Sequence, residues 1–272
     1  MSKAMISESI LADIANAIRT KDGSTATMKP TEMAAKITAI PTGGGDEALK
    51  TLTHKTIESY SDDELKTLGN NTFENCKKLK SVDIPNTTSI GSSAFSGCAG
   101  LTEISLPQVT SIGQSTFEDC TGLTSVSLPL VEELCGGNFI GCSSLVSVYL
   151  SNCYRMTGSS HFHGCSSLMK IDLPAVTELE MGSAPFDGCE SLEEIYLNSL
   201  SDLPAIYIFG YECMAKRIYL KSCVIIPRED YFRPLPNLEE IHFAKDNETM
   251  IKNQSGYASK FGATNATIYF DL

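Results

Sequence analysis

The sequence predicts an α/β solenoid, mainly of β-structure, with about eight coils of 22 to 24 residues behind a small N-terminal helical hairpin. Three observations predict it: a recurring phenylalanine, apolar residues at fixed distances after it, and a short alternating segment in each copy, before an irregular return. The phenylalanines are spaced by 22, 22, 22, 23, 24, 23 and 23 residues and stand at Phe73, Phe95, Phe117, Phe139, Phe162, Phe186, Phe209 and Phe232.

Each copy continues with a leucine six residues after the phenylalanine, replaced by Ala215 in the seventh copy, a valine or isoleucine after nine, and another apolar residue after eleven. In the third copy these are Leu123, Val126 and Leu128. The alternation, bounded by glycine and proline, is typical of a short strand. The return to the next strand is too short for a full helix, so successive strands must stack in parallel. At roughly 4.8 Å per strand, eight coils would extend over about 40 Å.

Six of the 10 cysteines stand three residues after a repeat phenylalanine. Equivalent positions of stacked coils lie above one another, so we expect a ladder of small, buried thiols rather than disulfides or a metal site. The ladder comprises Cys76, Cys98, Cys120, Cys142, Cys165 and Cys189. The sequence leaves open the state of the others, Cys135, Cys153, Cys213 and Cys223.

The segments ENCKKLKSVDIP, SGCAGLTEISLPQVTSIGQSTF and EDCTGLTSVSLP carry this pattern. They resemble the BspA-type leucine-rich repeats of bacterial surface and phage-borne proteins, and the resemblance covers about residues 57–243. It implies a leucine-rich-repeat solenoid that serves as an adhesin or binding surface rather than as a catalyst.

The N-terminal residues 1–41 differ from the repeats and predict two short amphipathic helices. Two such helices cannot bury both apolar stripes alone and need a partner. The string SILADIANAIRTKDGSTATMKPTEMAAKITAIPT is similar to the N-terminal module of tail and baseplate-associated proteins of phages of Gram-positive bacteria. The similarity implies attachment to other tail or baseplate subunits and a homo-oligomer. The alternative is a helical cap for the first coil.

Four further segments complete the predicted organisation. A glycine-rich linker occupies 42–49, a partial leading rung 50–72, the repeats 73–243, and a C-terminal strand cap 244–272. Ser61 and Glu64 match the capping box of a helix start within the leading rung.

Composition and motifs argue against several function classes. The net charge of −12 argues against nucleic-acid binding, and no apolar run is long enough to insert into a membrane. No catalytic or cofactor motif is present, so we expect no catalytic residue and no cofactor. His161, His163 and Cys165 resemble a metal cluster, but the two histidines flank a core phenylalanine. We therefore expect both to point outward and no metal to bind.

Residues eight and ten positions after each phenylalanine alternate with inward residues and should project from the outer face of the strands. In the N-terminal half these residues are mostly serines, whereas rings and charges gather in the C-terminal half. Such groups suit a sugar or a protein partner; alternatively, the tyrosines support one another laterally. The candidate binding residues are Tyr149, Lys170, Asp172, Glu194, Tyr196, Arg217, Tyr219, Glu240 and His242.

Together these features predict a phage or prophage tail-associated protein that recognises a bacterial surface glycan or protein. Its expected location is the virion tail. A bacterial cell-surface adhesin is the alternative, although no signal peptide or wall anchor is visible in the sequence. A glycan hydrolase and a purely structural spacer remain open as further alternatives.

Overall fold

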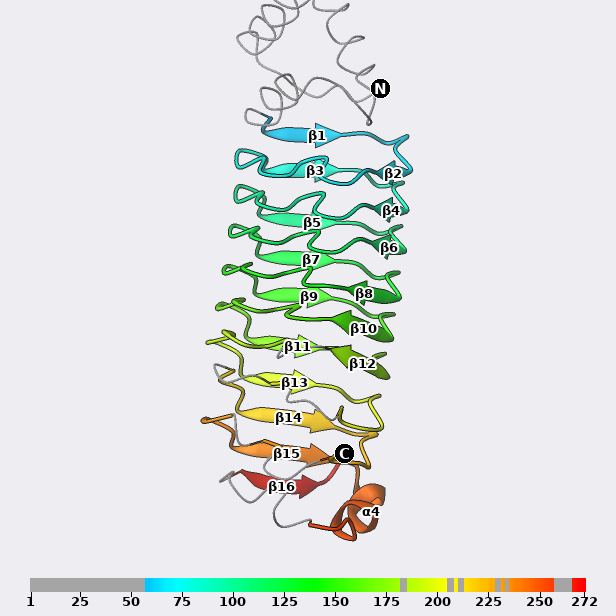
Figure 1. The fold of residues 1–272 in the computed structure, drawn as a ribbon, viewed down its shortest axis with the longest axis vertical. Helices are drawn as coiled ribbons and strands as arrows, with labels where there is room; N and C mark the ends of the chain where they lie inside the picture. Colours follow the sequence, from blue (N-terminus) through cyan, green and yellow to red (C-terminus); the bar gives the residue numbers. More distant parts are fainter. Residues whose placement is uncertain are drawn as a thin grey trace, which may run out of the picture.

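The computed structural model describes residues 57–181, 185–204, 208–209, 213–227, 231–232, 235–256 and 266–272. The predicted helical module at 1–41 and the linker at 42–49 lie outside these residues, as does the beginning of the leading rung. Within the described part, the chain forms an elongated stack of coils (Figure 1).

The predicted parallel solenoid is confirmed by one column of short strands running the length of the stack. Equivalent residues pair in register from coil to coil, for instance Val126 with Ile104 and with Val148. The column consists of β1 (Ser59–Ser61), β3 (Ser81–Asp83), β5 (Glu103–Ser105), β7 (Ser125–Ser127), β9 (Ser147–Tyr149), β11 (Lys170–Asp172), β13 (Glu194–Tyr196), β14 (Arg217–Leu220), β15 (Glu240–Phe243) and β16 (Thr267–Phe270).

A second set of short parallel strands lies beside this column and carries the returns of the coils as far as Met181 (Figure 1). The set consists of β2 (Thr67–Leu68), β4 (Ser89–Ile90), β6 (Ser111–Ile112), β8 (Glu133–Cys135), β10 (Arg155–Gly158) and β12 (Glu178–Met181). Near the C-terminal end, a 3₁₀ turn η1 (Lys245–Asn247) leads into the short helix α4 (Glu248–Lys252).

The repeat phenylalanines form a column of buried rings between the strands. Phe117 is fully buried and stacks on Phe95 at 5.5 Å and on Phe139 at 5.6 Å, measured between ring centroids. Each ring therefore fills the space between two neighbouring coils, and no coil buries its own ring alone. This contact fixes the order and spacing of the strands that carry the outer face.

The predicted ladder of thiols is confirmed, and all six of its members are buried and free. Each thiol from Cys98 onward donates a hydrogen bond to the phenylalanine carbonyl of the preceding coil, as Cys120 does to Phe95 across 3.0 Å. Of the other four cysteines, Cys153, Cys213 and Cys223 are also buried, and Cys135 is half-buried.

A second column of residues lies two positions after each repeat phenylalanine from Phe73 to Phe186, where the backbone adopts positive φ. Gly97 has a φ of 72° and Asn75, one coil earlier, has a φ of 60°. A Cβ atom at Gly97 would approach the Asn75 Oδ1 atom at 2.5 Å, which is too close. Glycine at this position therefore satisfies both the backbone conformation and the contact between coils.

The predicted capping box in the leading rung is wrong. Ser61 belongs to strand β1, and residues 62–66 form no helix. Asp62 instead accepts hydrogen bonds at its Oδ1 atom from the backbone N–H groups of Glu64 and Leu65, both across 3.0 Å. Pairing of β1 with β3 outweighs the local helix signal, because the strand completes the sheet over the first phenylalanine.

Candidate binding face

Two columns of side chains project from the strands β3 to β15 and form what we call the outer face. All of these residues are exposed or half-buried, which confirms the predicted orientation. One column contains Ser81, Glu103, Ser125, Ser147, Lys170, Glu194, Arg217 and Glu240. The other contains Asp83, Ser105, Ser127, Tyr149, Asp172, Tyr196, Tyr219 and His242, and it continues to Tyr269 of β16.

The C-terminal half of the outer face holds a continuous stack of rings. Tyr196 stacks on Tyr219 at 4.1 Å, Tyr219 on His242 at 4.7 Å, and His242 on Tyr269 at 4.7 Å, with interplanar angles of 6°, 16° and 12°. The Lys170 Nζ atom lies 4.1 Å from the centroid of the Tyr196 ring. The ring faces therefore contact one another and an ammonium group, which is the arrangement expected for lateral support.

Charged groups beside this stack pair with one another between coils. Arg217 donates to the Glu194 Oε1 atom from Nε across 3.0 Å and from Nη2 across 2.8 Å, and the Tyr196 hydroxyl donates to Glu194 Oε2. The bond from Arg217 to Glu194 raises the pKa of the guanidinium. Partial burial, together with hydrogen bonds to Tyr219 and Glu194, raises the pKa of Tyr196 above its ordinary value. Both groups keep their protons at neutral pH.

His242 connects the last coils through both of its ring nitrogens. Its Nε2 atom lies 3.2 Å from Glu240, and its Nδ1 atom lies 3.0 Å from Asp271. The side chain is only 12% exposed. Glu240, His242 and Asp271 thus use most of their polar atoms within the protein.

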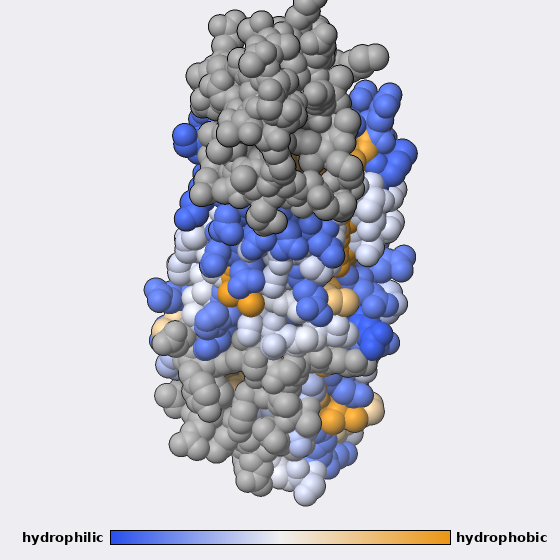
Figure 2. Space-filling model, turned by 45° about the horizontal axis from the view of Figure 1, so that its top comes forward, coloured by the Kyte–Doolittle hydropathy of each residue, from blue (hydrophilic) through white to orange (hydrophobic). Residues whose placement is uncertain are grey.

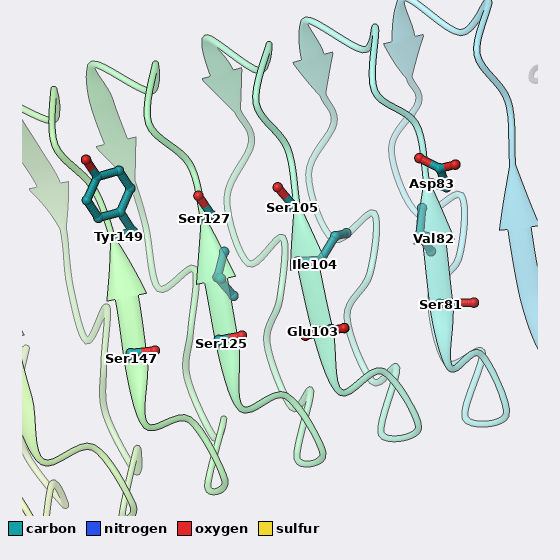
Figure 3. A pocket seen from close by; sticks show the side chains of 11 residues that line it. Ser81, Val82, Asp83, Glu103, Ile104, Ser105, Ser125, Ser127, Ser147 and Tyr149 are labelled. Atoms are coloured by element: carbon teal, nitrogen blue, oxygen red, sulfur yellow. The ribbon is translucent and has the colours of Figure 1, made fainter.

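The N-terminal half of the outer face differs, because a groove of about 420 Å³ crosses strands β3, β5, β7 and β9. Figure 3 shows two rows of side chains in it. One row runs from Asp83 through Ser105 and Ser127 to Tyr149, and the other contains Ser81, Glu103, Ser125 and Ser147. The serines are short, so the surface of the first row is hollow between Asp83 and Tyr149 at its ends.

The larger side chains of the groove are without partners within the described part of the chain. Asp83 and Glu103 form no ion pair with another described residue, and both are exposed. Tyr149 is 58% exposed and contacts no other described ring. Of the predicted binding residues, only Tyr149 lies in this groove; the other eight lie beyond it, on β11 to β15.

The sequence pattern favoured the C-terminal half of the outer face, which is richer in charges and rings, and gave no serine as a candidate binding residue. The signal that could have identified the groove was the size of the outward residues: five serines in four consecutive strands of the column, followed by one tyrosine. A row of small residues between larger ones produces a depression on a flat sheet. The binding role of all these residues stays a prediction.

The two histidines proposed to point outward behave differently from each other. His161 is fully buried, so the prediction is wrong for this residue, whereas His163 is exposed. His161 stands directly before the core phenylalanine, where the return of the coil turns inward, and its Nε2 atom lies 2.9 Å from the Thr157 carbonyl oxygen. Burial lowers the pKa of His161 to about 4, so the ring is neutral.

Two features are absent from the described residues. These residues contain no group of three or more histidine, cysteine, aspartate or glutamate side chains able to hold a metal ion. They also contain no helix that is long and apolar enough to cross a membrane. On the face presented in Figure 2, hydrophilic and neutral residues predominate among those coloured, and the hydrophobic ones form small, separate patches.

Solved structures with leucine-rich repeats resemble this fold at low sequence identity. A leucine-rich cell surface protein of Faecalibacterium prausnitzii A2-165 is 22% identical over 74% of this chain, with a TM-score of 0.33, and the chain spans only 64% of its length. The T. pallidum leucine-rich repeat protein is 22% identical over 68% of this chain and 72% of its own, with a TM-score of 0.37. An internalin of Listeria monocytogenes is 12% identical over 95% and 88%, with a TM-score of 0.35.

No curated protein matches the chain in sequence. The family model for the BspA type leucine-rich repeat region, of six copies, matches residues 48–155, 110–205 and 156–261. These matches together span well over half of the chain and include nearly all of the coils described above. The chain therefore belongs to the BspA-type leucine-rich repeat family.

Proposed function

We propose that this protein is a non-enzymatic binding protein that recognises a bacterial surface glycan or protein through its outer face. The observation that carries the proposal is the groove across β3 to β9, whose hydroxyl and carboxylate groups and single exposed ring are left without partners among the described residues. Polar groups that converge on a hollow with one aromatic side chain are typical of binding sites. The resemblance of the sequence to BspA-type repeats, which implies an adhesin or binding surface, also supports a binding function.

A cell-binding assay tests the proposal with one matched pair of variants. Ser105→Arg fills the groove, whereas Ser111→Arg places the same side chain at the exposed position of strand β6 in the same coil, outside the groove. We expect labelled full-length protein and the Ser111→Arg variant to bind Gram-positive cells, and the Ser105→Arg variant to bind at least about tenfold less. Equal binding by both variants would contradict a role of the groove in this recognition.

A second pair of substitutions separates the two halves of the outer face. If the C-terminal rings contact the receptor, Tyr196→Ala combined with Tyr219→Ala abolishes attachment. If the rings only support one another, the double variant is less stable but still binds at low temperature. If neither the groove variant nor the ring variant reduces binding, the outer face is a structural spacer.

We further propose that the protein is associated with a phage or prophage tail and assembles as a homo-oligomer through residues 1–41. Support comes from the resemblance of residues 9–42 to tail and baseplate modules. Mass spectrometry of particles purified after prophage induction tests this association, and the mass in solution tests the oligomer. The alternative, a bacterial surface adhesin, predicts recovery of the protein from protease-shaved cells and its absence from particles.

A hydrolase that acts on surface glycan is the alternative function from the class of enzymes. It predicts that the purified protein releases reducing ends from cell-wall polysaccharide. We expect no release, because the sequence contains no catalytic motif.

A further inference from the structure

The groove repeats the same polar chemistry at each coil. Strands β5, β7 and β9 pair in register, so that Glu103, Ser125 and Ser147 follow one another along one row, as Ser105, Ser127 and Tyr149 do along the other. Adjacent strands lie about 4.8 Å apart, so hydrogen-bonding groups recur at that interval along the axis of the solenoid. A regular row of this kind suits a polymer with a repeating set of polar groups better than a compact small molecule.

Tyr149 closes one end of this row and offers an aromatic surface to a ligand. Its neighbour in the preceding coil is Ser127, which is too short to cover the ring (Figure 3). The contrast with Tyr219 is direct, because Tyr219 has a ring on each side and Tyr149 has none among the described residues. An exposed ring beside hydroxyl groups can contact the C–H face of a sugar while the hydroxyls bond to its edge.

The charge of the groove limits which chains can bind. Asp83 and Glu103 are not neutralised by a described cation, and the whole chain carries a net charge of −12. A phosphate- or uronate-bearing polymer would be repelled from this surface. Carboxylates do, however, accept strong hydrogen bonds from neutral hydroxyl groups.

A protein partner fits the groove less well. Protein interfaces depend on aromatic or arginine anchors in desolvated pockets with a substantial apolar core. The groove offers the hydroxyls of five serines, the two carboxylates and one tyrosine ring, whereas the apolar Ile104 and Val126 in its lining are buried.

From these observations we infer that the groove holds a stretch of an uncharged glycan chain, which runs along the solenoid axis with one sugar against Tyr149. This inference rests on the proposed binding function and adds the class of ligand and its direction. The groove crosses four strands, which is about 14 Å between the outermost ones. Since one sugar unit spans roughly one strand spacing, the groove accommodates about three to four units.

The test uses full-length protein on an array of defined oligosaccharides of two to six units. The array contains neutral chains from bacterial surfaces and matched chains that carry uronate or phosphate. We expect retention of neutral chains only, with affinity that rises with length and levels off at about four units. Tyr149→Ala should weaken this binding by about five- to tenfold, and Tyr149→Phe should retain most of it.

Two controls make the assignment specific. Tyr154→Ala removes an exposed tyrosine outside the groove and should leave glycan affinity unchanged. Glu103→Gln keeps the shape of the side chain and removes its charge, so it should increase the binding of acidic chains relative to neutral ones.

Outcomes that contradict the glycan inference can be distinguished from outcomes that contradict the proposed binding function. Preference for acidic chains overturns the inference about charge, and unchanged binding by Tyr149→Ala overturns the location. If no glycan is retained although the protein still binds cells through the outer face, the ligand is not a saccharide and the proposed function survives. If cells are not bound either, the proposed function fails as well.

Discussion

The thiol of Cys98 donates a hydrogen bond to the carbonyl oxygen of Phe73, one coil earlier, across 3.0 Å. Because Cys98 is fully buried, Cys98→Ala removes this bond and leaves a small cavity between the two coils. We expect the substitution to reduce the free energy of unfolding by about 1 to 2 kcal/mol, measured by urea denaturation. Thr102→Ala, an exposed position of the same coil, is the control. A smaller loss for Cys98→Ala than for Thr102→Ala would contradict this role.

The stacked phenylalanines predict a larger effect in the middle of the array. Phe117→Ala removes ring contacts with both Phe95 and Phe139 and should reduce the free energy of unfolding by about 3 to 5 kcal/mol. Phe117→Leu should cost less, because it leaves a smaller cavity. Equal losses for the two variants in chemical denaturation would argue that ring stacking has little part in stability.

Substitution of Gly97 should strain the tight turn, by an amount that depends on Asn75 in the preceding coil. Gly97→Ala places a Cβ atom at positive φ and against Asn75, and we expect a loss of about 1 to 3 kcal/mol in the free energy of unfolding. In a double-mutant cycle, Asn75→Gly should recover part of that loss, because it removes the side chain that the new methyl group would meet. Strict additivity of the two substitutions would exclude the contact as the cause.

Thiol chemistry predicts how the protein responds to alkali. Burial raises the pKa of Cys76 to about 12, against an ordinary value of 9.0, and raises that of Cys213 and Cys223 to about 12 as well. These thiols ionise in the unfolded chain at a lower pH than in the folded one. Their contribution to stability is therefore complete below about pH 9 and decreases as the pH rises toward 12. Denaturation curves from about pH 7 to 10.5 measure this decrease, and a flat profile over that range would contradict it.

His161 predicts sensitivity to acid. Its pKa of about 4 in the folded state lies below the ordinary 6.5, so the unfolded chain takes up a proton first as the pH falls. The associated stability is present above pH 6.5 and is lost between 6.5 and about 4, in an amount of roughly 3 kcal/mol. His161→Leu should flatten that part of the pH profile.

The fold could be predicted largely from the sequence because each coil repeats the same apolar residues. Phe117, Leu123, Val126 and Leu128 recur at fixed distances, and all four are buried as expected. Local sequence signals gave wrong predictions of structure where contacts between coils override them. Ser61 resembles a helix cap but lies in a strand that pairs with β3, and His161 is polar but lies in the buried interior of the coil.

The sequence predicted which residues project from the outer face, but it did not predict the shape of that face. Alternation along a strand tells which residues project, and that part is confirmed. It does not tell whether neighbouring rings turn toward one another, as Tyr196 and Tyr219 do, or whether a hollow forms between Asp83 and Tyr149. Both depend on side-chain contacts across several coils, which a one-dimensional pattern does not contain.

Because successive coils pair in register, the number of coils can change during evolution. Because each coil contacts only its two neighbours, a whole copy of about 22 residues can be gained or lost without a new interface. Duplication of the coil around β7 would lengthen the groove by one serine pair and leave the ring stack intact. The length of the outer face is therefore set by the number of repeat copies in the sequence.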